Sequence, residues 1–111
     1  MKNELVKAVT AQDFDAEVMK SDLPVLVDFA TEWCGPCNAL KPVLQRLAAE
    51  ERGRLKVVTV DGDAHPELTT RFGVRGYPTV IVFAGGRELA RCLGLTTRER
   101  LVKLVNAPAA A

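Results

Sequence analysis

The sequence lacks both a strong charge of one sign and a long apolar segment. Its 111 residues include 15 lysines and arginines and 14 aspartates and glutamates, which give a formal net charge of +1. Without a block of like charges, nothing indicates binding to nucleic acid or to an anionic membrane. No segment approaches the length of a membrane span, and the apolar run at residues 5–9 is too short for a signal peptide. We therefore expect a cytoplasmic protein without membrane or nucleic acid partners.

Cysteine and histidine are also scarce, with three residues and one residue respectively. Cys34 and Cys37 are separated by two residues, a spacing found in zinc sites and in redox-active disulfides. Zinc generally takes four ligands, and only His65 and Cys92 remain, neither at a suitable spacing. Because disulfides in cytosolic proteins are usually catalytic or redox-sensing, we interpret the pair as redox active. We expect no metal and no cofactor other than this disulfide.

The chain is long enough for one domain with one sizeable core. Apolar runs between turn residues predict five strands, at 4–9, 25–30, 55–60, 79–83 and 88–93. Helical spacing predicts four helices, which begin after Thr10, at Cys34, at Asp63 and after Thr96. This order predicts an α/β fold with a central mixed β-sheet flanked by helices on both faces. The domain is expected to cover residues 1–106, and residues 107–111 are expected to form a flexible tail.

The cysteine pair is placed where a strand is followed by a helix. The strand at 25–30 is apolar except for Asp28, and apolar residues at helical spacing follow Cys37 up to a predicted end at Gly53. Cys34 is therefore close to a helix N-terminus, where unpaired N–H groups and the helix dipole favour an anion. The thiolate is the reactive form of cysteine, so Cys34 is the expected nucleophile. Cys37, one turn further on, is expected to be more buried and to act as the resolving thiol.

With these features the chain resembles the thioredoxin family over nearly its whole length. The resemblance is carried by the segments around the acid, the cysteines and a late Pro-Thr step, and by several single residues: Val27-Asp28-Phe29, Trp33-Cys34-Gly35-Pro36-Cys37, Pro42, Arg75-Gly76-Tyr77-Pro78-Thr79, Gly85-Gly86 and Gly94. It implies the thioredoxin fold and a protein-disulfide reductase active in cellular thiol redox homeostasis. The Gly35-Pro36 dipeptide is similar to that of the reducing members of the family.

The resemblance also implies roles for individual residues and partners. Asp28 would be a buried acid that accepts a proton from Cys37, and an acid in an apolar strand should have a raised pKa. Pro78 would follow a cis peptide bond. The groove that docks substrates would consist of Trp33, Gly35, Pro36, Gly76, Tyr77, Pro78 and Gly94. Electrons would come from thioredoxin reductase, an NADPH-dependent flavoenzyme, and would pass to disulfide-containing protein substrates from a monomeric protein.

Taken residue by residue, the sequence leaves plainer alternatives open. Asp28 could face solvent from its strand, Pro78 could open an edge strand in the trans form, and Trp33 could belong to the core. Strand alternation leaves the exposure of Cys92 undecided. An isomerase-like thioredoxin and a binding adapter without redox chemistry are the competing functions. The intact cysteine pair argues against the adapter.

Three positions depart from the usual family pattern. Ala30 stands where many thioredoxins have a second tryptophan, and Thr59 stands where a lysine is common near the buried acid. Tyr77 replaces a smaller aliphatic residue, and Gly76-Tyr77-Pro78-Thr79 is similar to the matching segment of protein disulfide isomerase domains. These departures bear on the pKa of Asp28, the redox potential and the choice of substrate, while leaving the reaction type as it is.

Overall fold

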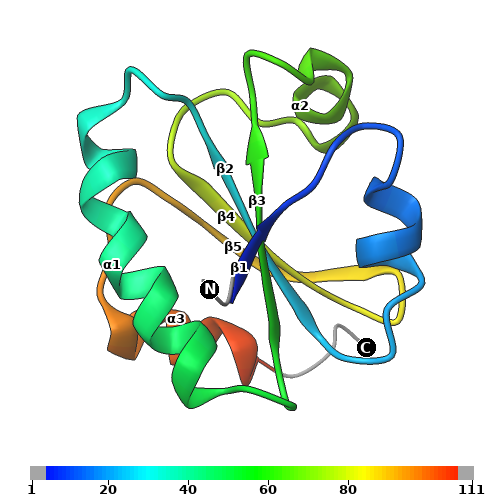
Figure 1. Cartoon of the computed structure of the whole chain (residues 1–111), viewed down its shortest axis with the longest axis vertical. Helices are drawn as coiled ribbons and strands as arrows, with labels where there is room; N and C mark the ends of the chain where they lie inside the picture. Colours follow the sequence, from blue (N-terminus) through cyan, green and yellow to red (C-terminus); the bar gives the residue numbers. More distant parts are fainter. Residues whose placement is uncertain (1–4, 108–111) are drawn as a thin grey trace, which may run out of the picture.

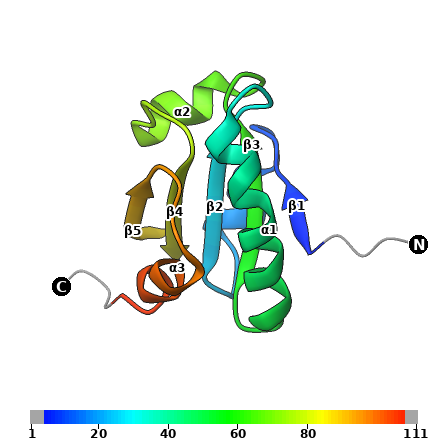
Figure 2. The same cartoon turned by 90° about the vertical axis from the view of Figure 1, so that its left-hand side faces the viewer.

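The computed structural model, which describes residues 5–107, contains one five-stranded mixed sheet. Figure 1 labels the strands, and Figure 2 shows them side by side in the order β1-β3-β2-β4-β5 across the sheet. Their bounds are Val6–Ala8 for β1, Val25–Ala30 for β2, Lys56–Asp61 for β3, Thr79–Ala84 for β4 and Arg87–Leu93 for β5. Strand β3 pairs in parallel with β1 and β2, whereas β4 pairs antiparallel with β2 and β5. The predicted fold class is therefore confirmed.

Helices cover both faces of the sheet. Helices α1 (Gly35–Glu50) and α3 (Arg98–Val105) lie on the same side, as Figure 2 shows. The short helices η1 (Asp15–Met19) and α2 (Pro66–Phe72) contribute Val18 and Leu68 to the apolar cluster on the opposite face. A second cluster lies beneath α1 and α3. The central strand β2 contributes to both clusters and is buried on both faces.

Strand β2 determines where the acid lies. Val25, Val27 and Phe29 belong to the cluster under η1 and α2, and Leu26 belongs to the cluster under α1. Since successive side chains of a strand point to opposite faces, Asp28 lies on the face of Leu26. The single carboxyl group of this strand is thereby placed beneath α1, the helix that carries the cysteines.

The first helical segment differs from the expected helix after Thr10. Thr10 and Asp13 exchange hydrogen bonds across a turn, with the Thr10 backbone N–H donating to Asp13 Oδ1 over 2.7 Å. The helix begins only at Asp15 and is a π-helix, in which the Lys20 backbone N–H donates to the carbonyl of Asp15. Thr10 and Asp13 thus form the hydrogen bonds expected of a helix cap, but they form them in a turn that precedes the helix.

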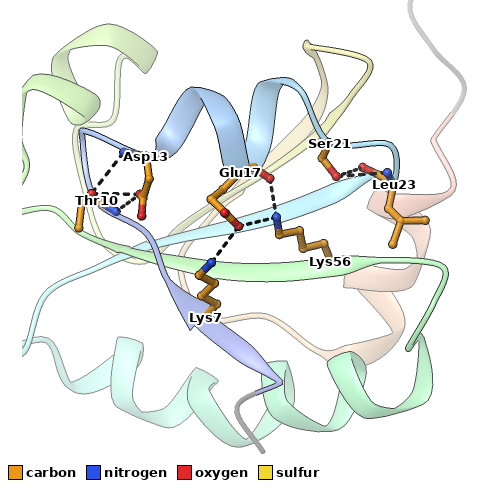
Figure 3. A network of polar contacts seen from close by, with 7 residues as sticks. All are labelled: Lys7, Thr10, Asp13, Glu17, Ser21, Leu23 and Lys56. Atoms are coloured by element: carbon orange, nitrogen blue, oxygen red, sulfur yellow. Dashed lines mark hydrogen bonds and ion pairs between the residues drawn. The ribbon is translucent and has the colours of Figure 1, made fainter.

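A polar network ties this π-helix to the sheet. Lys56 Nζ on β3 donates both to the backbone carbonyl and to the carboxylate of Glu17, each over 2.7 Å, and Lys7 on β1 also contacts this carboxylate (Figure 3). The two ammonium groups lower the pKa of Glu17 through their hydrogen bonds and charges. Lys56 takes a carbonyl at the end of the helix, where carbonyls lack helical partners.

Other element ends differ from the predicted ones by a few residues. Strand β1 is only three residues long, α1 ends at Glu50, and β3 runs from Lys56 to Asp61 rather than from 55 to 60. Helix α2 starts at Pro66 rather than at Asp63, because Asp61 Oδ1 accepts from the N–H groups of Asp63 and Ala64 in a turn. Residue 4 and the tail residues 108–111 lie outside the described residues.

The N-cap of α3 is Thr97, one residue later than predicted. Its hydroxyl accepts from the backbone N–H of Arg100 over 3.2 Å. Thr97→Ala should therefore lower the free energy of unfolding by about 1 kcal/mol, since a helix N–H loses its partner. Thr96→Ala, the matched control, should have almost no effect. Urea denaturation of the two variants distinguishes these positions, and equal effects would show that Thr97 is not the cap.

Candidate active site

The two cysteines of the motif are joined in a disulfide at the start of α1. Their Cα atoms are 5.2 Å apart. Cys34 retains 6% of its surface, whereas Cys37 is completely buried. The predicted difference in burial is therefore present, and of the two sulfur-bearing residues only Cys34 reaches the surface.

Cys34 is the N-cap of α1. Its Sγ accepts a hydrogen bond from the backbone N–H of Cys37 over 3.2 Å, and its carbonyl accepts from the N–H of Asn38 over 3.1 Å. Pro36 lies in the first turn, where its missing donor costs nothing and its fixed φ suits the helix. When the disulfide is open, the N–H of Cys37 and the positive end of the helix favour the anionic form of Cys34.

A second segment of the site lies at the beginning of β4. The Tyr77–Pro78 peptide bond is cis, as the resemblance implied. The backbone N–H of Gly94 donates to the carbonyl of Pro78 over 2.8 Å, and Thr79 Oγ1 donates to the carbonyl of Gly76 over 2.7 Å. Thr79 is opposite Phe29 in the pairing of β4 with β2. The segment therefore lies beside the end of β2 from which the chain continues to Cys34.

Trp33 is a surface residue and not part of the core. Its side chain is 71% exposed, and its Nε1–H donates to Asp63 Oδ2 over 2.6 Å. The ring of Tyr77 meets the indole edge to face, with ring centroids 6.3 Å apart. Trp33 is thus held from two directions while most of its surface remains open to solvent beside Cys34.

Gly62 is a part of this site that the sequence reasoning missed. A Cβ atom built on Gly62 would lie only 2.6 Å from two carbons of the Tyr77 ring and would also overlap its hydroxyl. The turn that follows Asp61 at the end of β3 can therefore approach the tyrosine only because residue 62 has no side chain. Burial, and then the carboxylates of Asp63 and Asp61, raise the pKa of Tyr77. Gly62 had looked like an ordinary turn residue because Tyr77 is distant in the sequence.

Asp28 is buried as expected, with 2% of its surface exposed. Desolvation raises the pKa of its carboxyl from 3.8 to about 7, and the positive charge of Lys41 opposes part of this rise. Its Oδ1 has no hydrogen-bond partner within residues 5–107. Thr59, opposite Asp28 on β3, donates its hydroxyl to the backbone carbonyl of Asp28 over 3.1 Å and not to the carboxyl group. An unpartnered acid with this pKa can take up or release a proton near neutral pH.

Comparison with known proteins agrees with this geometry. A family model described as Thioredoxin matches residues 5–107. Thioredoxin of Rickettsia bellii is 39% identical over 98 residues, which cover 88% of this chain and 93% of that protein. Thioredoxin 1 of Nostoc sp. is 40% identical over 93 residues, or 84% of this chain and 87% of that protein. The chain belongs to the thioredoxin family.

The family also includes a longer relative with a similar domain. The bifunctional thioredoxin reductase/thioredoxin of Mycobacterium leprae is 42% identical over 95 residues, which cover 86% of this chain and 21% of that protein. As a member of the thioredoxin family, the present protein is a disulfide reductase whose redox-active pair is Cys34 and Cys37. The expected reaction type is therefore confirmed.

Cys92 is buried in this thioredoxin-family protein, which settles the question that strand alternation had left open. Only 6% of its surface is exposed. A break in register between Val82 and Phe83 makes Leu89 an extra residue in β5, so simple alternation fails beyond it. Cys92 pairs with Val80, a member of the cluster beneath α1 and α3. Paired residues point to the same face, so Cys92 points inward.

Neither a metal cluster nor a membrane helix is found in residues 5–107. No group of three or more histidine, cysteine, aspartate or glutamate side chains in this range could hold a metal ion. Within the same range, no helix combines the length and the hydropathy that crossing a bilayer requires.

The contact between Gly62 and Tyr77 predicts the effect of Gly62→Ala. The added methyl group overlaps the ring, so the free energy of unfolding should fall by about 1–3 kcal/mol. In a Tyr77→Ala background the same substitution should cost almost nothing, because the obstacle has been removed. A double-mutant cycle measured by urea denaturation gives the coupling between the two positions. Purely additive effects would contradict the contact.

The buried acid predicts how stability depends on pH. Because the folded pKa of Asp28, about 7, lies above its unfolded value of 3.8, the folded state binds this proton more tightly. The contribution of Asp28 to stability is favourable below the unfolded pKa and is lost as pH rises through the folded one, at about 1.4 kcal/mol per pH unit. Asp28→Asn should therefore stabilise the oxidised protein at neutral pH by on the order of 2–4 kcal/mol. It should change stability little at pH 4.

Denaturant melts of both proteins between pH 4 and 8 check this expectation. Asp22→Asn is a suitable control, because Asp22 is exposed and should not flatten the profile. If the Asp28→Asn curve runs parallel to that of the unmodified protein, the acid is not desolvated in the folded state.

Proposed function

We propose that Cys34 is the attacking thiolate of the reductase and Cys37 the resolving thiol. The observation that carries this assignment is the cap of α1, in which Cys34 Sγ accepts from the Cys37 N–H while Cys37 is fully buried. Only a sulfur at the surface can reach the disulfide of a folded protein substrate. The helix N-terminus favours the negative charge on that same sulfur.

The reaction proceeds by two thiol–disulfide exchanges. Cys34 thiolate attacks one sulfur of the substrate disulfide, forms a mixed disulfide, and releases the other substrate sulfur as a thiolate. Cys37 then loses its proton and attacks Cys34 Sγ, which breaks the mixed disulfide and releases the second substrate sulfur. The substrate gains two electrons, and the protein is left with the Cys34–Cys37 disulfide.

Asp28 is the proposed acceptor of the Cys37 proton, by way of a water molecule. Its position beneath α1 and its unpartnered Oδ1 support this role. A general base works best when its pKa is close to the working pH, and the pKa of Asp28 is raised to about 7 by burial. A solvated carboxylate on the same strand would be a much weaker base for this step.

We further propose that the substrate docks on the surface around Cys34. Trp33, Gly35, Pro36, Gly76, Tyr77, Pro78 and Gly94 would form the groove, with the backbone of Tyr77 pairing with an extended segment of the substrate. The exposed indole of Trp33 supports this proposal, as do Leu93 and Leu95, which flank Gly94 in the sequence and are 69% and 56% exposed.

The electron donor, the oligomeric state and the cellular compartment are further parts of the proposal. A thioredoxin reductase that uses NADPH and a flavin is the proposed electron donor. The bifunctional thioredoxin reductase/thioredoxin of Mycobacterium leprae combines a reductase and a thioredoxin in one protein. We propose a monomer in the cytoplasm. The cytoplasmic assignment is inferred from the sequence and not from the relatives, one of which is a chloroplastic thioredoxin of Arabidopsis thaliana.

Substitution of each cysteine tests the assigned order. Cys34→Ser should abolish reduction of a protein disulfide, because no surface thiolate remains. Cys37→Ser should form the mixed disulfide and be unable to resolve it. Non-reducing gels and mass spectrometry, after mixing each reduced variant with a disulfide substrate, give the answer. Trapping by Cys34→Ser but not by Cys37→Ser would mean that the roles are reversed.

A further inference from the structure

A cavity of about 180 Å³ opens beside the buried acid. It is lined by residues of three strands and of α1: Val6, Asp28, Lys41, Leu44, Gln45 and Thr59. Among these, only Asp28 and Lys41 carry a charge. The cavity therefore connects the unpartnered carboxyl group on β2 with one ammonium group on the helix that carries the cysteines.

Thr59 cannot supply a charge to this cavity. The family pattern commonly has a lysine at this position of β3, but here the side chain is a hydroxyl that donates to the backbone of Asp28. Lys41 is exposed and forms no ion pair with any other residue in the part of the chain that the structure describes. Its side chain is consequently available to the carboxylate across the cavity.

We propose that Lys41 is a positioning residue for Asp28, with its ammonium group on α1 taking the electrostatic place that a lysine on β3 would otherwise fill. The proposal rests on the role of Asp28 as the proton acceptor for Cys37. In the resolving step the proton of Cys37 passes to Asp28 by way of water, and the new thiolate attacks Cys34 Sγ. Lys41 favours the ionised carboxylate before that transfer, and so maintains the fraction of Asp28 that can accept a proton.

The electrostatic surroundings support a single source for this effect. Burial alone raises the pKa of Asp28, and Lys41 is the one group whose charge lowers it. The neighbouring strands present the neutral residues Val6, Thr59 and Val80 to this face. Cys37 on α1 lies in the disulfide and does not titrate in the oxidised protein, and Cys92, paired with Val80 on β5, is the free thiol on this face within residues 5–107.

The first experiment measures the titration of Asp28 directly in the oxidised protein. Aspartate is labelled with ¹³C at its carboxyl carbon, and the Asp28 signal is identified by its absence in Asp28→Asn. Lys41→Met should raise the titration midpoint by about half a pH unit or more, as expected when a charge is removed from the lining of the same cavity in a medium of intermediate dielectric. Lys41→Arg, which keeps the charge, should leave the midpoint nearly unchanged.

Two further variants make the measurement specific. Lys103→Met removes an exposed lysine on α3, outside the cavity lining, and should not move the midpoint. Thr59→Lys in the Lys41→Met background should bring the midpoint back down, because it returns a positive charge to the same cavity from β3. A midpoint that is unaltered in Lys41→Met, or altered as much in Lys103→Met, would overturn the proposal.

A kinetic measurement separates this proposal from the role of Asp28 itself. The release of substrate from the mixed disulfide is followed in single turnovers between pH 5 and 9. In Lys41→Met the rate at pH 7 should fall about twofold to threefold, with the pH profile displaced by the same amount as the Asp28 midpoint. If the midpoint moves and the rate profile does not, Asp28 is not the proton acceptor and Lys41 has no part in the reaction. If neither moves, the proposal for Lys41 fails while the role of Asp28 stands.

Discussion

The burial of β2 on both faces is the constraint on which the rest of the structure depends. Its apolar residues belong to two separate clusters, one on each face of the sheet, and the helices on each face pack against the cluster beneath them. A strand of this kind has no face toward solvent, so an acidic side chain at any position along it is desolvated, as Asp28 is. The same strand leads directly into the turn that carries Cys34. Core packing and the proposed proton transfer therefore share one element, because the stability lost by burying Asp28 comes from the same raised pKa that suits it as the proposed acceptor of the Cys37 proton.

Most of this architecture could be predicted from the sequence because the signals are local. Continuous apolar runs identify buried strands, and the spacing of Cys34 and Cys37 before a helical pattern identifies the redox pair. The sequence was less informative where distant residues take part. Lys56 on β3 donates to the carbonyl of Glu17 in the first helical segment, and a break in register between β4 and β5 decides the orientation of Cys92, which strand alternation had left open. Neither effect leaves a mark in the local sequence.

The site shows the same division. The resemblance placed Asp28, Trp33 and the cis proline correctly, because these positions belong to a recognisable pattern. It drew attention to Thr59 as a missing lysine, but it could not show that Lys41 lines the same cavity from the opposite side. In the sequence Lys41 is one of several charged residues on an exposed helix face. Only the packing of α1 across the sheet brings Lys41 to Asp28. The effect of Thr59 on the acid therefore has to be considered together with the residues of α1.

The two edges of the sheet have a consequence for self-association. A protein that binds extended substrate segments, as we propose for this one, risks extending its own sheet with a second copy of itself. Strand β1 offers only three residues for such pairing, and β5 carries the exposed charges Arg87, Glu88 and Arg91 along the other edge. Short and charged edges discourage strand-to-strand aggregation. Both edges thereby disfavour backbone pairing with another chain, which leaves the segment before β4, the proposed docking position, as the place where such pairing would end in thiol–disulfide exchange rather than in a growing sheet.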